Sequence, residues 1–264
     1  PTVHPKLLEI FNRTVELGKD LALVTNGVRM GDKVQDVLVR GGKWVRVSID
    51  AGKAETYASI RSVSEKTHRA VWSNIENLVN KRNSSEGSEL LIGAGYVVTP
   101  ENWEEVYIFI EQAATAGVDN VRISAMFSNE GEDKHLPYLK ECNNLIRDAK
   151  KDFGESLKIF DMLGDRVDDL QEGAPDYKHC GYMKMNVYIG GDQNVYTCCN
   201  NAYNLSGLAG TLKDKTFEDF WNSSEAKDFY GDFDATKCAR CMFNNKNRFI
   251  NYLLLDDAQH VNYV

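Results

Sequence analysis

The sequence predicts an α/β fold with a parallel sheet, followed by a small cysteine-rich region. Four short apolar runs alternate strictly with helical segments, and a fifth run follows the last helix. Such alternation requires parallel strands joined by right-handed crossovers. The cysteine-rich region is indicated by the positions of the cysteines, since five of the six lie from Cys180 to Cys241.

Each expected strand is an apolar run of strand length that ends in polar or glycine residues. These runs cover residues 20–27, 44–52, 89–98, 120–126 and 156–163. Apolar residues at helical spacing predict helices before and between the strands. These helices are expected within residues 1–18, 33–42, 53–81, 99–117 and 136–153. Thr99 is expected to cap its helix, with Pro100 at the first helical position.

Two sheet architectures are compatible with this pattern. Five strands are too few to close an eight-stranded barrel, and the glycine fingerprint of a doubly wound nucleotide-binding sheet is missing. An open sheet or an incomplete barrel is therefore expected, and in both a ligand meets the carboxyl ends of the strands. The residues at those ends are Thr25, Asn26, Ser48, Asp50, Gly95, Tyr96, Arg122 and Ser124. Individually each also suits a turn or a packing position, and only the set suggests a site.

The overall charge narrows the range of partners. The chain has 264 residues, a net charge of −8 and a pI near 5.2. This balance argues against a nucleic-acid groove or an anionic membrane surface. No apolar run reaches the roughly 18 residues of a membrane span and no signal peptide is recognisable, so we expect a cytoplasmic protein. The chain begins at Pro1 without an opening strand, which suggests a piece of a longer protein.

The cysteine pattern predicts a four-thiolate site. Cys238-Ala-Arg-Cys241 places two thiolates on one tight turn, as metal-binding Cys-x-x-Cys pairs do. Cys180 and Cys198 flank an expected hairpin, which brings its two ends together. We therefore expect Cys180, Cys198, Cys238 and Cys241 to converge. Cys199 points the other way along its strand and is expected to pack as a thiol.

Three interpretations of these cysteines are open. Disulfides would leave Cys142 over in a chain without a secretory segment. Structural zinc commonly uses two Cys-x-x-Cys knuckles, and only one is present. An iron–sulfur cluster tolerates scattered spacing and is favoured. The five histidines form no ligand pattern and are expected to be surface or packing residues, with only His179 adjoining a cysteine: His4, His68, His135, His179 and His260.

Several segments resemble motifs of radical S-adenosylmethionine (SAM) enzymes of the SPASM/Twitch branch, over essentially the whole chain. Residues 1–5 (PTVHP) resemble the segment that contacts the methionine end of SAM, and LVTNG the end of the family's third strand. VSIDAGKAETYASIR resembles the fourth-strand motif, GAGYVVT the fifth strand and VRISAM the sixth. The tail from Cys180 through NVYTCC and GTLKDKTFEDFWNS to KCARC is similar to the domain that holds an auxiliary [4Fe-4S] cluster.

The resemblance implies roles for individual residues. Ser48 and Asp50 would face the ribose of SAM, Arg61 its carboxylate, and the backbone of the fifth strand its adenine. The implied cofactor-binding set is Pro1, Thr25, Asn26, Ser48, Asp50, Arg61, Gly95, Tyr96 and Ser124. Arg122 would orient SAM or assist deprotonation in catalysis, and a structural salt bridge is an equally good expectation for it.

The resemblance also implies a fold. Residues 1–165 would form a partial (β/α)6 TIM-type barrel, incomplete at its N-terminus, and residues 166–264 a small cysteine-rich Twitch/SPASM-like domain. The first strand, a Cys-x3-Cys-x2-Cys loop and the second strand are expected before Pro1, together with a second [4Fe-4S] cluster. No cysteine follows Cys241, which favours the one-cluster Twitch type, similar in cysteine layout to the aminocyclitol dehydrogenase of butirosin biosynthesis. Asp192-Gln193-Asn194 departs from the family's usual Asp-Gly-Asn turn.

The implied activity is radical chemistry. A reduced cluster would donate an electron to SAM and release a 5′-deoxyadenosyl radical that abstracts hydrogen, while the auxiliary cluster accepts an electron from the substrate. The first hypothesis is dehydrogenation of a small molecule such as a sugar or aminocyclitol, and the second is modification of a peptide or protein. The third, from another class, is a non-catalytic metal-stapled binding domain. The implied electron donor is a flavodoxin or ferredoxin.

Overall fold

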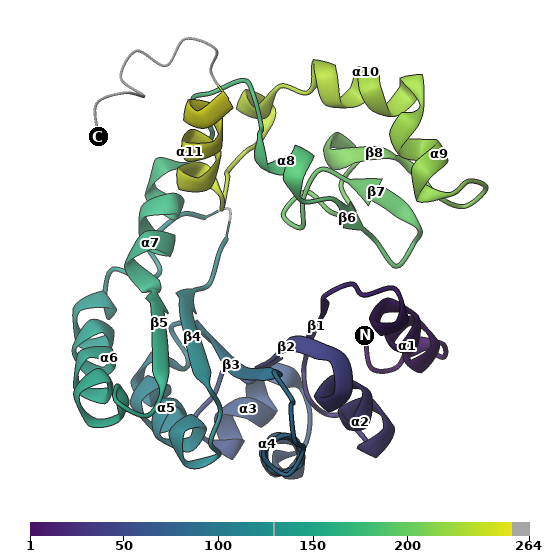
Figure 1. The fold of residues 1–264 in the computed structure, drawn as a ribbon. Coiled ribbons are helices and arrows are strands. Elements are labelled where there is room, and N and C mark those ends of the chain that lie inside the picture. Colours follow the sequence, from purple (N-terminus) through teal and green to yellow (C-terminus); the bar gives the residue numbers. More distant parts are fainter. Residues whose placement is uncertain (129, 255–264) are drawn as a thin grey trace. The chain divides into compact units, whose positions relative to one another are not determined.

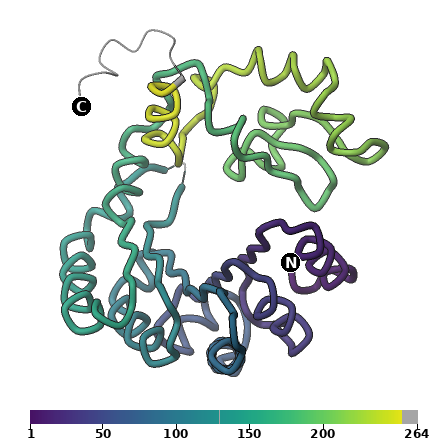
Figure 2. The backbone as a smooth tube through the Cα atoms, viewed as in Figure 1, coloured from purple at the N-terminus to yellow at the C-terminus, as the bar shows by residue number. Residues whose placement is uncertain are grey.

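The structure is a computed structural model that describes residues 1–128 and 130–254. The chain folds into two compact units, and Figure 2 traces the backbone through both. Unit 1 comprises residues 1–126 and 132–167, and unit 2 comprises residues 127–131 and the chain from Asp168 onward. None of the helices in the described ranges is both long enough and apolar enough to span a membrane.

Unit 1 contains a five-stranded parallel sheet, as the sequence predicts. Its strands are β1 (Leu21–Thr25), β2 (Gly42–Ser48), β3 (Leu91–Val98), β4 (Asn120–Ala125) and β5 (Lys158–Met162). Neighbours in the sheet are neighbours in the sequence, in the order β1-β2-β3-β4-β5, and every pair is parallel. A doubly wound sheet reverses its order at a switch point, and this sheet has no reversal.

The helices of unit 1 cover one face of this sheet (Figure 1). They are α1 (Leu7–Glu16), α2 (Asp32–Gly41), α3 (Ala54–Arg61), α4 (Glu65–Asn83), α5 (Val106–Thr115) and α6 (Leu139–Phe153). Helix α7 (Leu163–Glu172) follows β5, and the boundary between the units falls within it, after Val167. Alternate residues of each strand point into this helix layer. Val47, Ala94 and Val121 on the strands are fully buried there, together with Ile75 of α4 and Phe109 of α5.

The helix expected over residues 53–81 is divided in two. Ser62 ends α3 in a left-handed conformation with φ 53° and ψ 48°. Ser64, in extended conformation, then precedes α4. Serine competes poorly for helix interiors because its hydroxyl offers the backbone other hydrogen bonds, and two serines here allow the chain to turn.

The helix after β3 begins later than the sequence predicts. Thr99 Oγ1 accepts from the Glu101 N–H over 3.3 Å, as the expected cap would. Pro100, however, lies in a turn over residues 100–102, and a 3₁₀ helix over Trp103–Glu105 leads into α5. Asn102 is the reason. Its buried side chain accepts a hydrogen bond from the Thr99 N–H (2.7 Å) and donates to the carbonyls of Asp50 and Val97 (both 2.9 Å). These contacts join the loop after β2 to the end of β3.

Unit 2 is built from short elements. They are α8 (Tyr182–Met185), β6 (Tyr188–Ile189), β7 (Asn194–Tyr196), β8 (Leu208–Thr211), α9 (Phe217–Asn222), α10 (Ser224–Asp232) and α11 (Asn244–Leu254). The expected hairpin is confirmed, because β6 and β7 pair antiparallel. Gln193 occupies its turn with φ 65°, a position where glycine is free of strain. The Asp192 carboxylate supports the turn by accepting from the Asn194 N–H (3.1 Å) and the Tyr196 hydroxyl (2.6 Å).

We predict that Asn102→Ala destabilises unit 1 by about 2–4 kcal/mol, because it removes the side-chain partner of the buried Asp50 carbonyl and of the partly buried Val97 carbonyl and Thr99 N–H. Urea unfolding followed by tryptophan fluorescence measures this. Asn143→Ala is the matched control, since Asn143 is an exposed residue of α6. A loss no larger than that of the control would contradict the role given to Asn102.

Candidate functional site

Four cysteines of unit 2 line one cavity. Cys180 precedes α8, Cys198 follows β7, and Cys238 and Cys241 lie on the turn before α11. Segments that are about 60 residues apart in sequence therefore supply sulfur atoms to one space. The cavity walls are otherwise formed mainly by aromatic and amide side chains, among them Tyr177, Tyr182, Asn201, Phe243 and Asn247.

The state of the cysteines can be compared with the two alternatives to a cluster, which are disulfides and a single metal ion. All six cysteines lie in the described part of the chain and none forms a disulfide. Across residues 1–128 and 130–254, no three His, Cys, Asp or Glu side chains are grouped closely enough to hold one metal ion.

Burial governs the ionisation of these thiols. Desolvation raises the pKa of Cys180, Cys238 and Cys241, and the negative charge of neighbouring thiolates raises each further. Cys198 is among those neighbours in all three cases. Mutual repulsion of this kind is relieved when a positively charged metal centre binds the thiolates.

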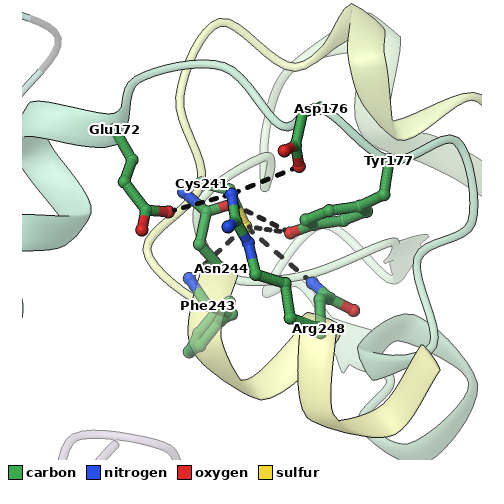
Figure 3. Close-up of polar contacts among 8 residues, drawn as sticks. Glu172, Asp176, Tyr177, Cys241, Phe243, Asn244 and Arg248 are labelled. Carbon is green, nitrogen blue, oxygen red and sulfur yellow. Dashed lines mark hydrogen bonds and ion pairs between the residues drawn. The ribbon is translucent and has the colours of Figure 1, made fainter. Parts of the chain in front are cut away.

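Hydrogen-bond donors point at the sulfur of Cys241 (Figure 3). The Tyr177 hydroxyl donates to its Sγ over 3.6 Å and the Phe243 N–H over 3.3 Å, while the Asn247 amide lies 3.9 Å away. Asn201 donates likewise to Cys238 Sγ over 3.4 Å. N–H and O–H donors of this kind stabilise thiolates and the sulfurs of a bound cluster.

The start of α11 is anchored around these donors. Arg248 forms ion pairs with Glu172 (3.3 Å) and Asp176 (3.2 Å), as Figure 3 shows. The Tyr177 hydroxyl also lies 2.9 Å from Asn244 Oδ1, so its single hydrogen is shared between that oxygen and Cys241 Sγ.

One buried polar atom at the cavity lacks a partner. Thr197 Oγ1 makes no hydrogen bond, although Thr197 is almost fully buried and lines the cavity. A buried hydroxyl without a partner is costly, so an acceptor in the cavity would satisfy it. The thiols, the N–H and O–H donors and this hydroxyl together fit an iron–sulfur cluster. Cys199 does not line the cavity, as expected, but it is exposed, so the prediction that it packs as a thiol is wrong. Cys142 is fully buried in unit 1.

The strand-end residues of unit 1 divide between the two faces of the sheet. Ser48, Gly95 and Arg122 are register partners on adjacent strands and form one row on the face opposite the helices. Ser124 lies on the same face. Tyr96 points instead into the core, where its hydroxyl donates to the Asn102 carbonyl over 2.6 Å.

Asp50 and Arg61 meet directly. The Asp50 carboxylate forms an ion pair with Arg61 and accepts from the Val97 N–H over 2.8 Å. Burial raises the pKa of Asp50, while both of these hydrogen bonds act in the opposite direction. Asp50 adopts φ 61°, and the Gly95 carbonyl accepts from the N–H groups of Ile49 and Asp50. Strain held in place by surrounding contacts is typical of functional loops.

Other strand-end residues make local contacts. Thr25 is buried on the helix side and accepts from the Gly27 N–H (3.2 Å), and Asn26 accepts from the Val28 N–H (3.3 Å), so both support a turn. Pro1 is exposed, and its carbonyl accepts from the His4 N–H. These contacts are local, and none of them joins Thr25, Asn26 or Pro1 to the row of Ser48, Gly95 and Arg122.

The histidines of the described ranges are packing or surface residues, as the sequence predicts. His68 is buried, accepts from the Trp72 indole (3.1 Å), and has a pKa lowered mainly by burial. His135 is fully buried and contacts the Tyr138 hydroxyl and the Met126 carbonyl. His4 and His179 join no metal-ligand group there. His260 lies outside the described residues.

Sequence reasoning missed two kinds of site residue. Glu105 is buried and accepts from the N–H groups of Gly52 (3.0 Å) and Lys53 (2.9 Å), which holds the loop carrying Asp50. Arg46 shares the helix-free face with Arg122. Alternation along β2 was the available signal for Arg46, since it lies two residues before Ser48.

Comparisons with known proteins support the character of the tail. Residues 180–242 match the family model of the SPASM domain, an iron–sulfur cluster-binding domain. The chain is 22% identical over 242 residues to the tungsten-containing aldehyde ferredoxin oxidoreductase cofactor-modifying protein of Pyrococcus furiosus, covering 84% of this chain and 65% of that protein. It is 27% identical over 124 residues to a probable GTP 3′,8-cyclase of Saccharolobus islandicus, covering 47% and 38%.

The fold resembles a solved structure along nearly the whole chain. Streptococcus suis SuiB bound to S-adenosylmethionine superimposes with a TM-score of 0.62 at 10% identity, covering 97% of this chain and 61% of SuiB. SuiB bound to its precursor peptide SuiA gives a TM-score of 0.60 with the same coverage. At this identity the likeness concerns the fold alone. The chain spans less than two thirds of the length of each of these relatives.

Proposed function

We propose that this chain is part of a radical SAM enzyme of the SPASM branch, in which unit 2 holds an auxiliary [4Fe-4S] cluster through Cys180, Cys198, Cys238 and Cys241. The main support for this proposal is the cavity lined by these four cysteines, in which N–H and O–H donors point at the sulfurs of Cys238 and Cys241. The SPASM match over residues 180–242 supports the same assignment. A single auxiliary cluster is part of this proposal and corresponds to the Twitch layout, since residues 242–264 contain no cysteine.

For residues 1–165 we propose a partial (β/α)6 barrel that binds SAM, and for residues 166–264 the cluster domain. The unreversed order of the parallel strands is the order of consecutive strands in such a barrel, and the fold of SAM-bound SuiB supports it. Ser48, Asp50, Arg61 and the backbone of Gly95 are the proposed SAM contacts. Thr25 and Tyr96 would contribute through their backbone alone, because both side chains are buried on the helix side.

The proposed reaction is hydrogen abstraction from a bound substrate with net oxidation. When bound, the clusters supply electron transfer and SAM supplies the abstracting group. The residues of this chain orient SAM and the substrate and exclude water, and Arg122 orients one of them. The second [4Fe-4S] cluster and a flavodoxin or ferredoxin donor are parts of the same proposal.

The substrate class follows from the relatives more than from the residues. A cofactor-modifying protein is among the relatives in sequence, and the structural neighbour SuiB binds a precursor peptide. Modification of a peptide or a cofactor precursor is therefore supported at least as well as the dehydrogenation of a sugar or aminocyclitol that the sequence first suggested.

We predict that the chain binds about four irons after anaerobic reconstitution with iron and sulfide, and that serine at any of the four cavity cysteines removes most of them. Iron and acid-labile sulfide are counted per chain. Cys199→Ser is the matched control and keeps the full count, because Cys199 does not line the cavity.

The same preparation separates the rival functions. One zinc per chain, or no metal dependent on these cysteines, would exclude the cluster. A full-length natural protein that binds iron but forms no 5′-deoxyadenosine from SAM under reducing conditions would be the non-catalytic metal-stapled binding domain instead.

We predict that Tyr177→Phe lowers the reduction potential of the bound cluster by roughly 20–60 mV, since a donor to Cys241 favours the more negative, reduced state. Redox titration followed by EPR measures it. Tyr182→Phe is the control, because its hydroxyl accepts from the Asn186 amide. An unchanged or raised potential in Tyr177→Phe would show that this hydroxyl does not act on the cluster.

A further inference from the structure

The face of the sheet that the helices leave uncovered is basic, although the chain as a whole is acidic. Asp and Glu number 39 in the chain against 31 Lys and Arg, yet the strand positions on this face include Arg46, Arg122 and Lys158 and no carboxylate. The strand residues of this face are Ala22, Val24, Trp44, Arg46, Ser48, Leu91, Gly93, Gly95, Val97, Asn120, Arg122, Ser124, Lys158, Phe160 and Met162.

The two arginines converge over a glycine. Gly93 is the register partner of Arg46, and Gly95 is that of Arg122. The Arg46 side chain nevertheless reaches the next row, because a Cβ placed on Gly95 would lie 3.5 Å from Arg46 Cδ and 3.8 Å from its Nε. Arg46 therefore reaches the row that holds Arg122, and its side chain lies in van der Waals range of the position that a side chain on Gly95 would occupy.

Neither guanidinium has an anionic partner within residues 1–128 and 130–254. Arg122 donates from Nε to the sulfur of Met162 over 3.1 Å, and Arg46 lies over the Trp44 ring with Cζ 5.8 Å from the ring centroid. Both side chains are about half buried. Burial and the positive charges of Arg46 and Arg166 lower the pKa of Arg122. Two half-buried like charges destabilise a fold unless an anion joins them.

We propose that Arg46 and Arg122 together bind an oxyanion of the substrate, a carboxylate or a phosphate, on the uncovered face of the sheet. Planar guanidiniums bind these groups through paired, charge-assisted hydrogen bonds. Ser48 stands in the row of Gly95 and Arg122 and adds a hydroxyl donor. Trp44 and Phe160 border the pair on the same face, so the substrate is an anion with an apolar body next to its charge.

The substrate assignment rests on the proposed function, and the anion site itself does not. Binding is therefore measured on the anaerobically reconstituted whole chain, without turnover, by phenylglyoxal modification of arginines, located by peptide mass spectrometry. Inorganic phosphate, acetate and SAM are the three probes. Phosphate or acetate is expected to protect Arg46 and Arg122 and not Arg147, whose exposed side chain lies 3.5 Å from Asp148. The more effective of phosphate and acetate identifies the type of anion.

Each arginine is then replaced in turn. In Arg46→Gln the phosphate concentration that half-protects Arg122 is expected to rise about tenfold, and the reverse variant is expected to act likewise on Arg46. Arg147→Gln is the control and leaves both values unchanged. Melting temperatures in anion-free buffer are expected to stay level or rise in the two variants, because a like charge is removed.

Three results would overturn the proposal. Equal protection of Arg147, or no protection of the pair, would show that no oxyanion site exists. Protection by SAM alone would assign the pair to the SAM carboxylate. Oxyanion binding without SAM cleavage by the full-length protein would leave the site standing and remove only the radical SAM assignment.

Discussion

Convergence of four sulfurs on one cavity is the constraint on which unit 2 depends. In the described part of unit 2, the strands have two, three and four residues, and one apolar cluster contains six buried residues. A core of that size does not hold a domain of such short elements by itself, so bonds through an inorganic centre are the physical alternative. Cys180, Cys198 and the Cys238–Cys241 turn belong to three separate segments, and a cluster bound by them would link all three.

Unit 1 achieves its stability in another way and leaves one face for chemistry. The helix side of its sheet is closed by apolar residues such as Val47, Ile92 and Phe109. The opposite side carries cations, serines and two glycines, and the carboxyl ends of the strands lie beside Asp50. Asn102 and Glu105 brace the loop that holds Asp50 in its left-handed conformation. Packing thus occupies one face of the sheet, and the proposed ligand site lies on the other.

Local patterns account for what the sequence predicted well. Strand positions, the hairpin and the Cys-x-x-Cys turn are each encoded within about ten residues, where periodicity and turn chemistry dominate. The break at Ser62 and the turn at Asn102 were missed because they depend on competition between local hydrogen bonds and helix formation. For Asn102, the deciding partners, Asp50 and Val97, are contributed by other elements.

The hydrogen-bond donors to the cysteine sulfurs could not be predicted from the sequence either, because they are contributed by distant segments of the chain. Asn201 and Tyr177 meet Cys238 and Cys241 across 37 and 64 residues of sequence, and no spacing rule connects them. Arg46 could have been predicted from the sequence, because alternate residues of a strand share a face and Arg46 lies two residues before Ser48 on β2. Its convergence with Arg122 needs the register of three strands and the bare surface of Gly95, which only the structure supplies.

Iron K-edge X-ray absorption of the anaerobically reconstituted chain tests the central claim most directly. A four-cysteine cluster predicts an iron–sulfur shell accompanied by an iron–iron shell, both lost together when Cys238 and Cys241 are replaced by serine. A sulfur shell without iron neighbours, or iron that stays bound in that double variant, would contradict the account.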